Sequence, residues 1–207
     1  ALRVKEYDPW YPRRDEAYLG VMIDDLVTRG TNEPYRMFTS RAEFRLMLRE
    51  DNADLRLTEK ARSLGLIDDN HWEEFSQRKR RLKEEHERLE SFRVNPLLGL
   101  GEEVSKILGQ PLRKVQTLME LLKRPEIDYK TLMQIPGAGP GVDDKKVISQ
   151  LENIARYSGY IERQSLEVEK SLANENARIP IEIDYGRVFG LSAEVEQKLT
   201  EHRPVTL

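Results

Sequence analysis

The chain has 207 residues, of which 38% are hydrophobic and 34% are charged, which is typical of an ordinary globular protein. It contains no cysteine, and this excludes a disulfide framework, thiolate zinc sites and cysteine nucleophiles. Its formal net charge of -3 argues against binding of polyanions by overall charge, so a contact with nucleic acid requires a local cluster of cations.

The chain begins with a segment, residues 1–18, that has no hydrophobic periodicity and contains Pro-Trp-Tyr-Pro at 9–12. This pattern indicates an extended tail or the end of a preceding domain. From Leu19, apolar residues recur at helical spacing and predict a helix. Gly30 is expected to end that helix in a left-handed conformation.

A second helix is predicted from Ser40, because Ser40-Arg41-Ala42-Glu43 has the pattern of a capping box. Its buried face would carry Phe44, Met47 and Leu48, and Asn52 would end it. Just before it, alternating residues leave room for one short β hairpin near residues 33–40, the single place where the sequence allows one.

Further helices are predicted from helical spacing of apolar residues and from capping and stop residues. They are a short helix from Thr58 to Gly65, a long helix that Asp68, Asp69 or Asn70 begins and that runs through Phe92, shorter helices around 104–108 and 112–123, and one that Asp128 caps and Pro136 stops.

The glycine-rich stretch IPGAGPGVDD, residues 135–144, is expected to be a flexible connector between helices. A dinucleotide-binding loop is excluded, since its third glycine would fall on Val142 and no strand is predicted before it. A Walker loop is excluded too, because no Gly-Lys-Ser/Thr ending is present.

The longest helix is predicted over residues 144–174, with an apolar seam of Val147, Leu151, Ile154, Ile161, Val168 and Leu172. Such a helix needs a partner, and the long helix before Phe92 offers Trp72, Phe75, Leu82 and Leu89 at similar spacing. The expected fold class is therefore mainly α, an elongated helical bundle with two long amphipathic helices.

The last segment is predicted to be extended up to Val188, to turn at Gly190 and to begin a short helix capped by Ser192. The expected domain organisation is a tail at 1–18, a helical bundle at 19–178, and a linker with the start of a small helical domain at 179–207. No apolar run approaches the roughly 18 residues of a membrane span, so we expect a cytoplasmic protein without membrane contact.

Three arginines of the helix predicted after Ser40 attract attention by their spacing. Arg41, Arg45 and Arg49 stand at i, i+4 and i+8, with no acidic residue three or four positions away. On one helix edge, each like-charge neighbour costs a few tenths of a kcal/mol. The arrangement needs either carboxylates from elsewhere in the fold or an external anion such as phosphate, and the residues leave both open.

Arg36 precedes these three arginines and Arg56 follows them, with aromatic Tyr35 and Phe38 interleaved. Together they can form a basic patch in an acidic protein. Elsewhere the three histidines lie far apart, and paired aspartates at helix starts are better explained as caps. No catalytic, cofactor-binding or metal-binding residue is therefore predicted in this chain.

Four stretches of the sequence resemble one known family. They are residues 17–67 (AYLGVMIDDLVTRGTNEPYRMFTSRAEFRLMLREDNADLRLTEKARSLGLI), YSGYIERQ from Tyr157, LANENARIP from Leu172 and DYGRVFGLSAEVEQKLTEHRP from Asp184. They closely resemble the glucose-inhibited division protein A family, the flavin-containing tRNA uridine carboxymethylaminomethyl modification enzymes. The glycine-rich connector and its flanks match least well.

The resemblance implies a longer parent protein, with an FAD-binding Rossmann domain, an inserted NADH-binding domain, catalytic cysteines and an all-helical region. This chain looks like the helical region only. By resemblance, the parent is a homodimer that works with a partner GTPase and adds a carboxymethylaminomethyl or aminomethyl group to the fifth carbon of a wobble uridine in tRNA. FAD, NADH and methylenetetrahydrofolate serve that chemistry.

The resemblance also implies that the helical region docks tRNA and the GTPase. On this basis Arg36, Arg41, Arg45, Arg49 and Arg56 are the expected phosphate contacts. The alternative is a helical protein–protein adaptor without nucleic-acid binding, in which the same arginines pair with internal carboxylates.

Overall fold

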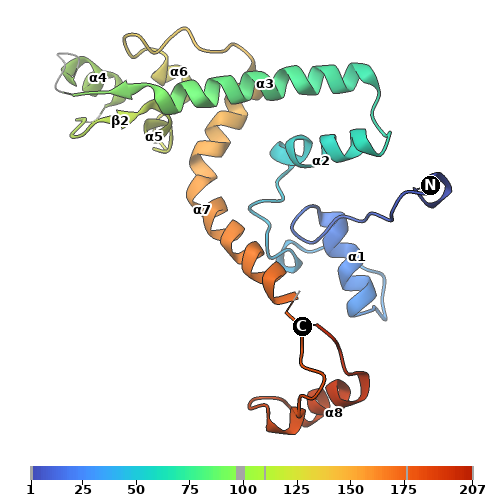
Figure 1. Ribbon diagram of the computed structural model, residues 1–207. Helices are drawn as coiled ribbons and strands as arrows, with labels where there is room; N and C mark the ends of the chain where they lie inside the picture. Colours follow the sequence, from blue (N-terminus) through green and yellow to red (C-terminus); the bar gives the residue numbers. More distant parts are fainter. Residues whose placement is uncertain (1, 97–100, 110, 176, 207) are drawn as a thin grey trace. The chain divides into compact units, whose positions relative to one another are not determined.

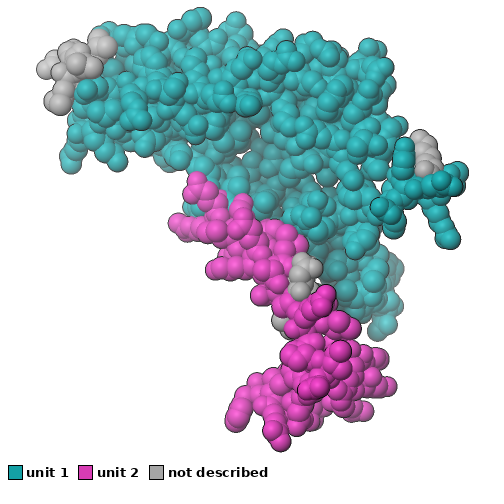
Figure 2. Space-filling model, viewed as in Figure 1, with its two compact units in different colours: residues 1–161 teal, residues 162–207 magenta. Residues whose placement is uncertain are grey.

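The computed structural model describes residues 2–96, 101–109, 111–175 and 177–206. Two compact units divide the chain, Ala1–Ile161 and Glu162–Leu207 (Figure 2). The first unit contains the elements from α1 to the first half of α7, and the second contains the rest of α7 and α8. The mainly helical fold with two long helices that the sequence predicted is confirmed (Figure 1).

Helices form most of the described residues. The α-helices are α1 (Tyr18–Thr28), α2 (Ala53–Ser63), α3 (Asp69–Ser91), α4 (Gly101–Leu108), α5 (Leu118–Leu122), α6 (Tyr129–Leu132), α7 (Lys145–Glu175) and α8 (Ala193–His202). Single 3-10 turns occur at Leu2–Lys5, Thr39–Arg41, Glu50–Asn52 and Tyr185–Arg187. A two-stranded antiparallel sheet pairs β1 (Arg93–Val94) with β2 (Gln116–Thr117).

Three predicted helix starts are confirmed by their capping hydrogen bonds. The Asp68 carboxylate accepts from the amide of His71 at 2.8 Å and begins α3. Asp128 accepts from the amide of Thr131 at 2.8 Å and begins α6. Ser192 accepts from the amide of Val195 at 3.3 Å and begins α8. A short polar side chain before a helix satisfies an amide that has no partner within the helix, which makes these starts readable from sequence.

The helix predicted after Ser40 was wrong. Residues 40–52, all of them described, form a 3-10 turn, a turn at 43–47 and a second 3-10 turn, and α2 begins only at Ala53. The capping box fails because the Glu43 carboxylate binds the guanidinium of Arg14, with Nε–Oε1 and Nη2–Oε2 distances of 2.6 and 2.8 Å. Arg41, Arg45 and Arg49 therefore do not share a helix edge.

Other elements differ in place. The short strand pair lies at β1 and β2, whereas the described residues 34–38 are in no strand. The helix expected at 112–123 begins at Leu118, since Thr117 both pairs with β1 and forms a capping box with Glu120. The Thr117 hydroxyl accepts from the Glu120 amide at 3.1 Å, and the Glu120 carboxylate accepts from the Thr117 amide at 2.8 Å.

Two boundaries also shifted. The short helix expected to start at Thr58 starts five residues earlier, at Ala53, and ends as predicted before Gly65, whose φ is +73°. In the second unit, the segment expected to be extended up to Val188 contains the 3-10 turn Tyr185–Arg187, because the Asp184 carboxylate accepts from the Gly186 amide at 3.1 Å.

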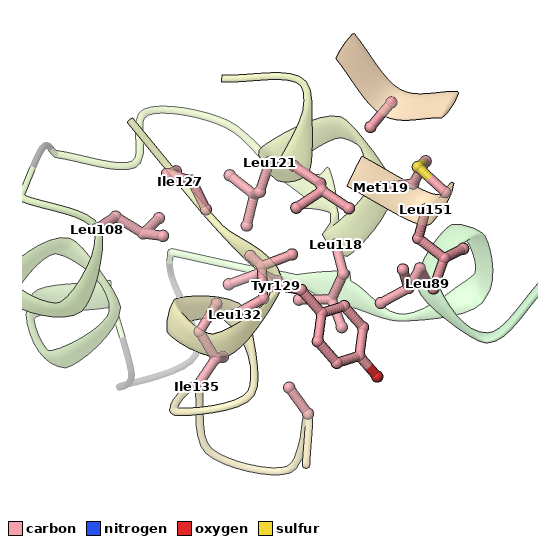
Figure 3. Packing of buried hydrophobic residues seen from close by; sticks show 14 of the residues in the cluster. Leu89, Leu108, Leu118, Met119, Leu121, Ile127, Tyr129, Leu132, Ile135 and Leu151 are labelled. Atoms are coloured by element: carbon pink, nitrogen blue, oxygen red, sulfur yellow. The ribbon is translucent and has the colours of Figure 1, made fainter. Parts of the chain in front are cut away.

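The main core lies in the first unit, where the second half of α3 packs with α4, α5, α6 and the start of α7 (Figure 3). Fully buried leucines dominate it, at positions 89, 118, 121, 122, 132 and 151. Each buried leucine stabilises the fold by about 1.5–3 kcal/mol relative to an exposed one. The predicted seam of α7 is buried at Val147, Leu151 and Val168, whereas Ile154 is only partly buried.

The glycine-rich connector before α7, expected to be flexible, makes hydrogen bonds to this core. Ala138 is fully buried, and its carbonyl accepts from Arg88 Nη1 at 2.6 Å. The Val142 amide donates to the Tyr129 hydroxyl at 2.8 Å, and that hydroxyl donates to the buried Glu85 carboxylate. Burial, together with the bond to Glu85, raises the pKa of Tyr129 to about 12, so the hydroxyl stays protonated at neutral pH.

A second, smaller core positions the predicted arginine site. Val21 on α1 packs with Ala42 and Leu48, and all three side chains are buried. Tyr18, also on α1, packs against them. The segment between α1 and α2 is thus held on α1 by apolar contacts at two points of its length.

In the second unit, the segment that follows α7 pairs with the segment that follows α8. The Ile179 amide donates to the Val205 carbonyl at 2.9 Å, next to a bridge between Arg178 and Thr206. Tyr185 is buried, and Phe189 is fully exposed.

Candidate functional site

Four of the five predicted arginines lie in the segment between α1 and α2. We call residues 33–49 the arginine loop; it contains Arg36, Arg41, Arg45 and Arg49, and Arg56 lies on α2. The loop has little regular structure, so its shape depends on what its side chains bind. Its shape is set by hydrogen bonds and ion pairs with Arg14 and with residues of α1.

Arg14, in the segment before α1, is the centre of those contacts. Its Nη1 donates to Asp24 Oδ2 at 2.8 Å and to Asp25 Oδ1 at 2.9 Å. Its Nε and Nη2 bind the two carboxylate oxygens of Glu43, and Nη2 also donates to the Arg41 carbonyl at 3.0 Å. One guanidinium therefore joins the segment before α1, the helix α1 and the arginine loop.

Asp25 is the buried member of this cluster, with only 1% of its surface exposed. Its Oδ2 accepts from the Tyr35 hydroxyl at 2.8 Å and from Arg41 Nη1 at 3.4 Å. Burial alone would raise the pKa of Asp25, but the hydrogen bonds from Arg14, Tyr35 and Arg41 outweigh it and hold the pKa below its ordinary value. Asp25 therefore remains ionised and binds the loop at neutral pH.

The cluster nearly neutralises itself. Its charged members are Arg14, Arg41, Asp24, Asp25 and Glu43, so two positive charges meet three negative ones. The hydrogen bonds from Arg14 lower the pKa of Glu43, even though partial burial opposes this. We refer to these residues with Tyr35 as the Arg14 cluster.

Arg41 and Arg49 bind within the fold. Arg41 contacts Asp25 and lies over the Tyr35 ring, with its guanidinium carbon 5.1 Å from the ring centre. Arg49 donates from Nε to Asp51 Oδ1 at 2.9 Å and from Nη1 to the Leu46 carbonyl at 2.6 Å. Its side chain is 13% exposed. Most of its hydrogen-bonding capacity is therefore used inside the protein.

Arg56 is likewise committed to internal contacts. Its Nε donates to Asn52 Oδ1 at 2.9 Å, Nη2 donates to the Arg49 carbonyl at 3.2 Å, and Nη1 donates to the Glu16 carbonyl. Partial burial and the nearby Arg49 lower its pKa. Arg56 thus ties α2 to both the end of the arginine loop and the segment before α1.

Arg36 and Arg45 differ from the other three. Both are exposed, and within the described part of the chain neither makes a hydrogen bond, an ion pair or a ring contact. Each lies close in sequence to a residue of the Arg14 cluster, Arg36 directly after Tyr35 and Arg45 two residues after Glu43. Phe38, between them, is 53% exposed. The structure thus anchors the loop on one charged cluster and leaves two of its guanidinium groups in solvent.

Sequence reasoning missed Arg14 and Asp25. Arg13-Arg14 lies in a segment without periodicity, and the adjacent pair Asp24-Asp25 suggested only metal binding, which its spacing on a helix does not favour. No periodic signal connects residues that are ten positions apart across a turn. The lack of an acid near Arg41, however, did indicate that a carboxylate from elsewhere could pair with it, and Asp25 is that carboxylate.

A shallow pocket of about 360 Å³ lies where α2 meets α3, lined by Thr58, Leu66, Ile67, Asp68, His71, Glu74, Phe75 and Arg78. Three of its polar side chains have partners: His71 contacts Asp68, and Arg78 pairs with Asp54. Among the described residues, no cluster of three metal-ligating side chains occurs, and no helix is both long and apolar enough to cross a membrane.

Family comparisons match most of this mainly helical chain. Residues 69–165 match the model described as tRNA modifying enzyme MnmG/GidA C-terminal helical domain. Residues 167–207 match the model described as tRNA modifying enzyme MnmG/GidA C-terminal helical bundle. The two matches meet close to the boundary between the compact units, at residues 161 and 162.

Solved structures of GidA from Aquifex aeolicus share this fold. The form II crystal structure has a TM-score of 0.72 and 34% sequence identity over 99% of this chain and 32% of that chain. The form I crystal structure has a TM-score of 0.69 and 34% identity over 99% of this chain and 31% of that chain. The fold and the matches define the helical part of a tRNA-modifying enzyme. The chain belongs to the MnmG/GidA family and carries its C-terminal helical domains, spanning about a third of the length of the Aquifex proteins.

Proposed function

We propose that this chain binds tRNA through the arginine loop, with Arg36 and Arg45 as the residues that contact phosphate. The observation that carries the proposal is their exposure without a partner, beside a cluster in which the other charges are paired. Guanidinium groups bind phosphate oxygens with paired hydrogen bonds, and an exposed aromatic ring such as Phe38 can stack on an unpaired base.

The other three arginines of the predicted site take different parts in this proposal. Arg41 has a partly exposed side chain, 37% by surface, and can add a phosphate contact at the edge of the loop. Arg49 and Arg56 hold the backbone of the loop, Arg49 by donating to the Leu46 carbonyl and Arg56 by donating to the Arg49 carbonyl. In this proposal two or three of the five arginines contact RNA directly, and the others support the loop.

The proposal extends to the enzyme of which such a region is part. With a partner GTPase, that cytoplasmic homodimeric enzyme adds a carboxymethylaminomethyl group at the fifth carbon of the wobble uridine of tRNA. FAD, NADH and methylenetetrahydrofolate supply the chemistry there. The glycine-rich connector does not fit a flavin pyrophosphate, because α6 precedes it and the Tyr129 hydroxyl fills the space beside Gly141. No chemical step is therefore assigned to this chain.

A salt titration of tRNA binding tests the proposal. The affinity of the chain for unmodified tRNA is measured by fluorescence anisotropy at several salt concentrations, for Arg36→Ala, Arg45→Ala and the matched control Arg80→Ala on the exposed face of α3. Loss of one phosphate contact reduces the slope of log affinity against log salt by about one. We expect this reduction for Arg36→Ala and Arg45→Ala, and an unchanged slope for Arg80→Ala.

The internal contacts of Arg41, Arg49 and Arg56 favour a second candidate, a helical adaptor that binds protein and not RNA. The same titration separates the two. If Arg36→Ala, Arg45→Ala and Arg80→Ala all keep the affinity and salt slope of the unaltered chain, the RNA-binding proposal is overturned and the adaptor remains.

A further inference from the structure

The sequence motifs gave Arg14 no role, and it is not one of the proposed phosphate contacts. It lies outside the arginine loop, and its side chain is 23% exposed. Its five donor groups are directed at Asp24, Asp25, Glu43 and the Arg41 carbonyl, all of which belong to α1 or to the loop. No donor remains for a ligand, so Arg14 does not contact RNA itself.

The Arg14 cluster fixes the loop at two points that flank the exposed guanidinium groups. At the first point, Tyr35 donates to the Asp25 carboxylate that Arg14 also binds. At the second point, Glu43 is held by two parallel hydrogen bonds from Arg14. Arg36 follows the first point directly, and Arg45 lies two residues beyond the second. Removal of Arg14 would take away both of these hydrogen bonds at the second point and would weaken the first.

We infer that Arg14 is a positioning residue for RNA binding, which acts by holding the backbone that presents Arg36 and Arg45. This inference rests on the proposed function. The planar fork of arginine is needed for the role, because lysine keeps the charge but cannot bind both oxygens of Glu43 and both aspartates at once.

A double-mutant cycle tests it. In the otherwise unaltered chain, Arg14→Lys is expected to weaken tRNA binding about fivefold, and in the Arg36→Ala/Arg45→Ala background the same change is expected to alter affinity less than about twofold. The matched control is Arg13→Lys, whose side chain pairs with Asp15 and Glu16 outside the cluster. It is expected to keep full affinity.

A local measurement separates positioning from a general loss of stability. Trypsin cleaves after exposed arginines, and mass spectrometry gives the cleavage rate at each. We expect Arg14→Lys to speed cleavage after Arg36 and Arg45 and to leave cleavage after Arg80 unchanged. Should Arg14→Lys not fold, Glu43→Gln weakens the second point from the other side. It is expected to speed cleavage after Arg45, to leave cleavage after Arg80 unchanged, and to weaken binding less in the Arg45→Ala background than in the otherwise unaltered chain.

The outcomes are distinct. Wild-type affinity for Arg14→Lys, or an equal loss in both backgrounds of the cycle, overturns the positioning role. Equal acceleration of cleavage at Arg36, Arg45 and Arg80 overturns it as well, since that result describes global destabilisation. If instead Arg36→Ala and Arg45→Ala have no effect on binding, the proposed function fails first, independently of Arg14.

Discussion

The guanidinium of Arg49 lies over the ring of Tyr157, with its central carbon 4.5 Å from the ring centre. This contact joins the end of the arginine loop to α7, more than a hundred residues later in the chain. A neighbouring hydrogen bond of 3.1 Å, from Asn153 on α7 to Asp51, lies two residues after the end of the loop. The loop is thus held on one side by the Arg14 cluster and on the other by α7.

The first prediction concerns this attachment. Arg49→Ala removes the contacts with Asp51 and Tyr157 and leaves the Leu46 carbonyl without its donor, so it should lower the free energy of unfolding by about 1–3 kcal/mol. Arg45→Ala, in the same loop, should change it by less than about 0.5 kcal/mol. Urea denaturation measures both. Equal values for the two variants would contradict the division between internal and exposed arginines.

The second prediction concerns the connector before α7. Gly141 has a φ of +73°, and a Cβ there would lie 2.2 Å from the Tyr129 hydroxyl and 2.5 Å from the Met133 sulfur. Gly141→Ala should therefore destabilise the protein by more than about 1 kcal/mol. The control is Gly159→Ala within α7, where the new methyl group meets open space and should stabilise by about 0.5–1 kcal/mol. Thermal denaturation should shift in opposite directions for the two variants.

The third prediction tests the buried hydroxyl that holds the connector. Tyr129→Phe leaves the Val142 amide without an acceptor and removes a donor from the Glu85 carboxylate, at an expected cost of about 1–3 kcal/mol. Tyr160→Phe, on the exposed side of α7, should change stability by less than about 0.5 kcal/mol. Chemical denaturation measures the free energy of unfolding of both variants. An unchanged free energy for Tyr129→Phe would mean that another group replaces the hydroxyl.

The fourth prediction follows from the lowered pKa values of Asp25 and Glu43. In the unfolded chain these carboxyls titrate near their ordinary values of about 4, so the unfolded state takes up protons first as the pH falls. Their stabilisation is complete above that pH and is lost as the pH falls through the lower folded values. Glu43→Gln should thus have a lower melting temperature than the unaltered chain at pH 7.

The difference between those two melting temperatures should shrink below about pH 4, because protonation of Glu43 then does what the substitution does. Thermal denaturation across this pH range measures it. A difference that stays constant down to about pH 3 would show that the Glu43 carboxylate contributes through shape and not through charge.

The sequence predicted those parts of the fold that depend on short-range chemistry. Asp68, Asp128 and Ser192 cap helices by bonds to amides three residues ahead, and such bonds need no knowledge of the rest of the chain. The seam at Val147 and Leu151 is similarly local, because its spacing alone places both on one face.

The candidate site was less predictable, because its geometry depends on distant partners. Ser40 and Glu43 have the spacing of a capping box, but two charge-assisted bonds from Arg14 outweigh one bond to an amide. The helix is lost for that reason, and with it the common edge of Arg41, Arg45 and Arg49. What the sequence did identify is that these arginines have no acid three or four positions away. In the structure Arg41 pairs with Asp25 and Arg49 pairs with Asp51, whereas Arg45 has no partner among the described residues.

The anchoring of the arginine loop has an entropic consequence for recognition. Ordering a flexible backbone on binding costs about 1–2 kcal/mol per residue, and the Arg14 cluster meets that cost during folding at Tyr35 and Glu43. In the proposed complex, the side chains of Arg36 and Arg45 would still have to be immobilised, at about 0.5–1.5 kcal/mol each. If the loop binds RNA as proposed, this preorganisation would let a protein with a net charge of -3 hold a polyanion with few contacts, where a disordered basic tail would need many.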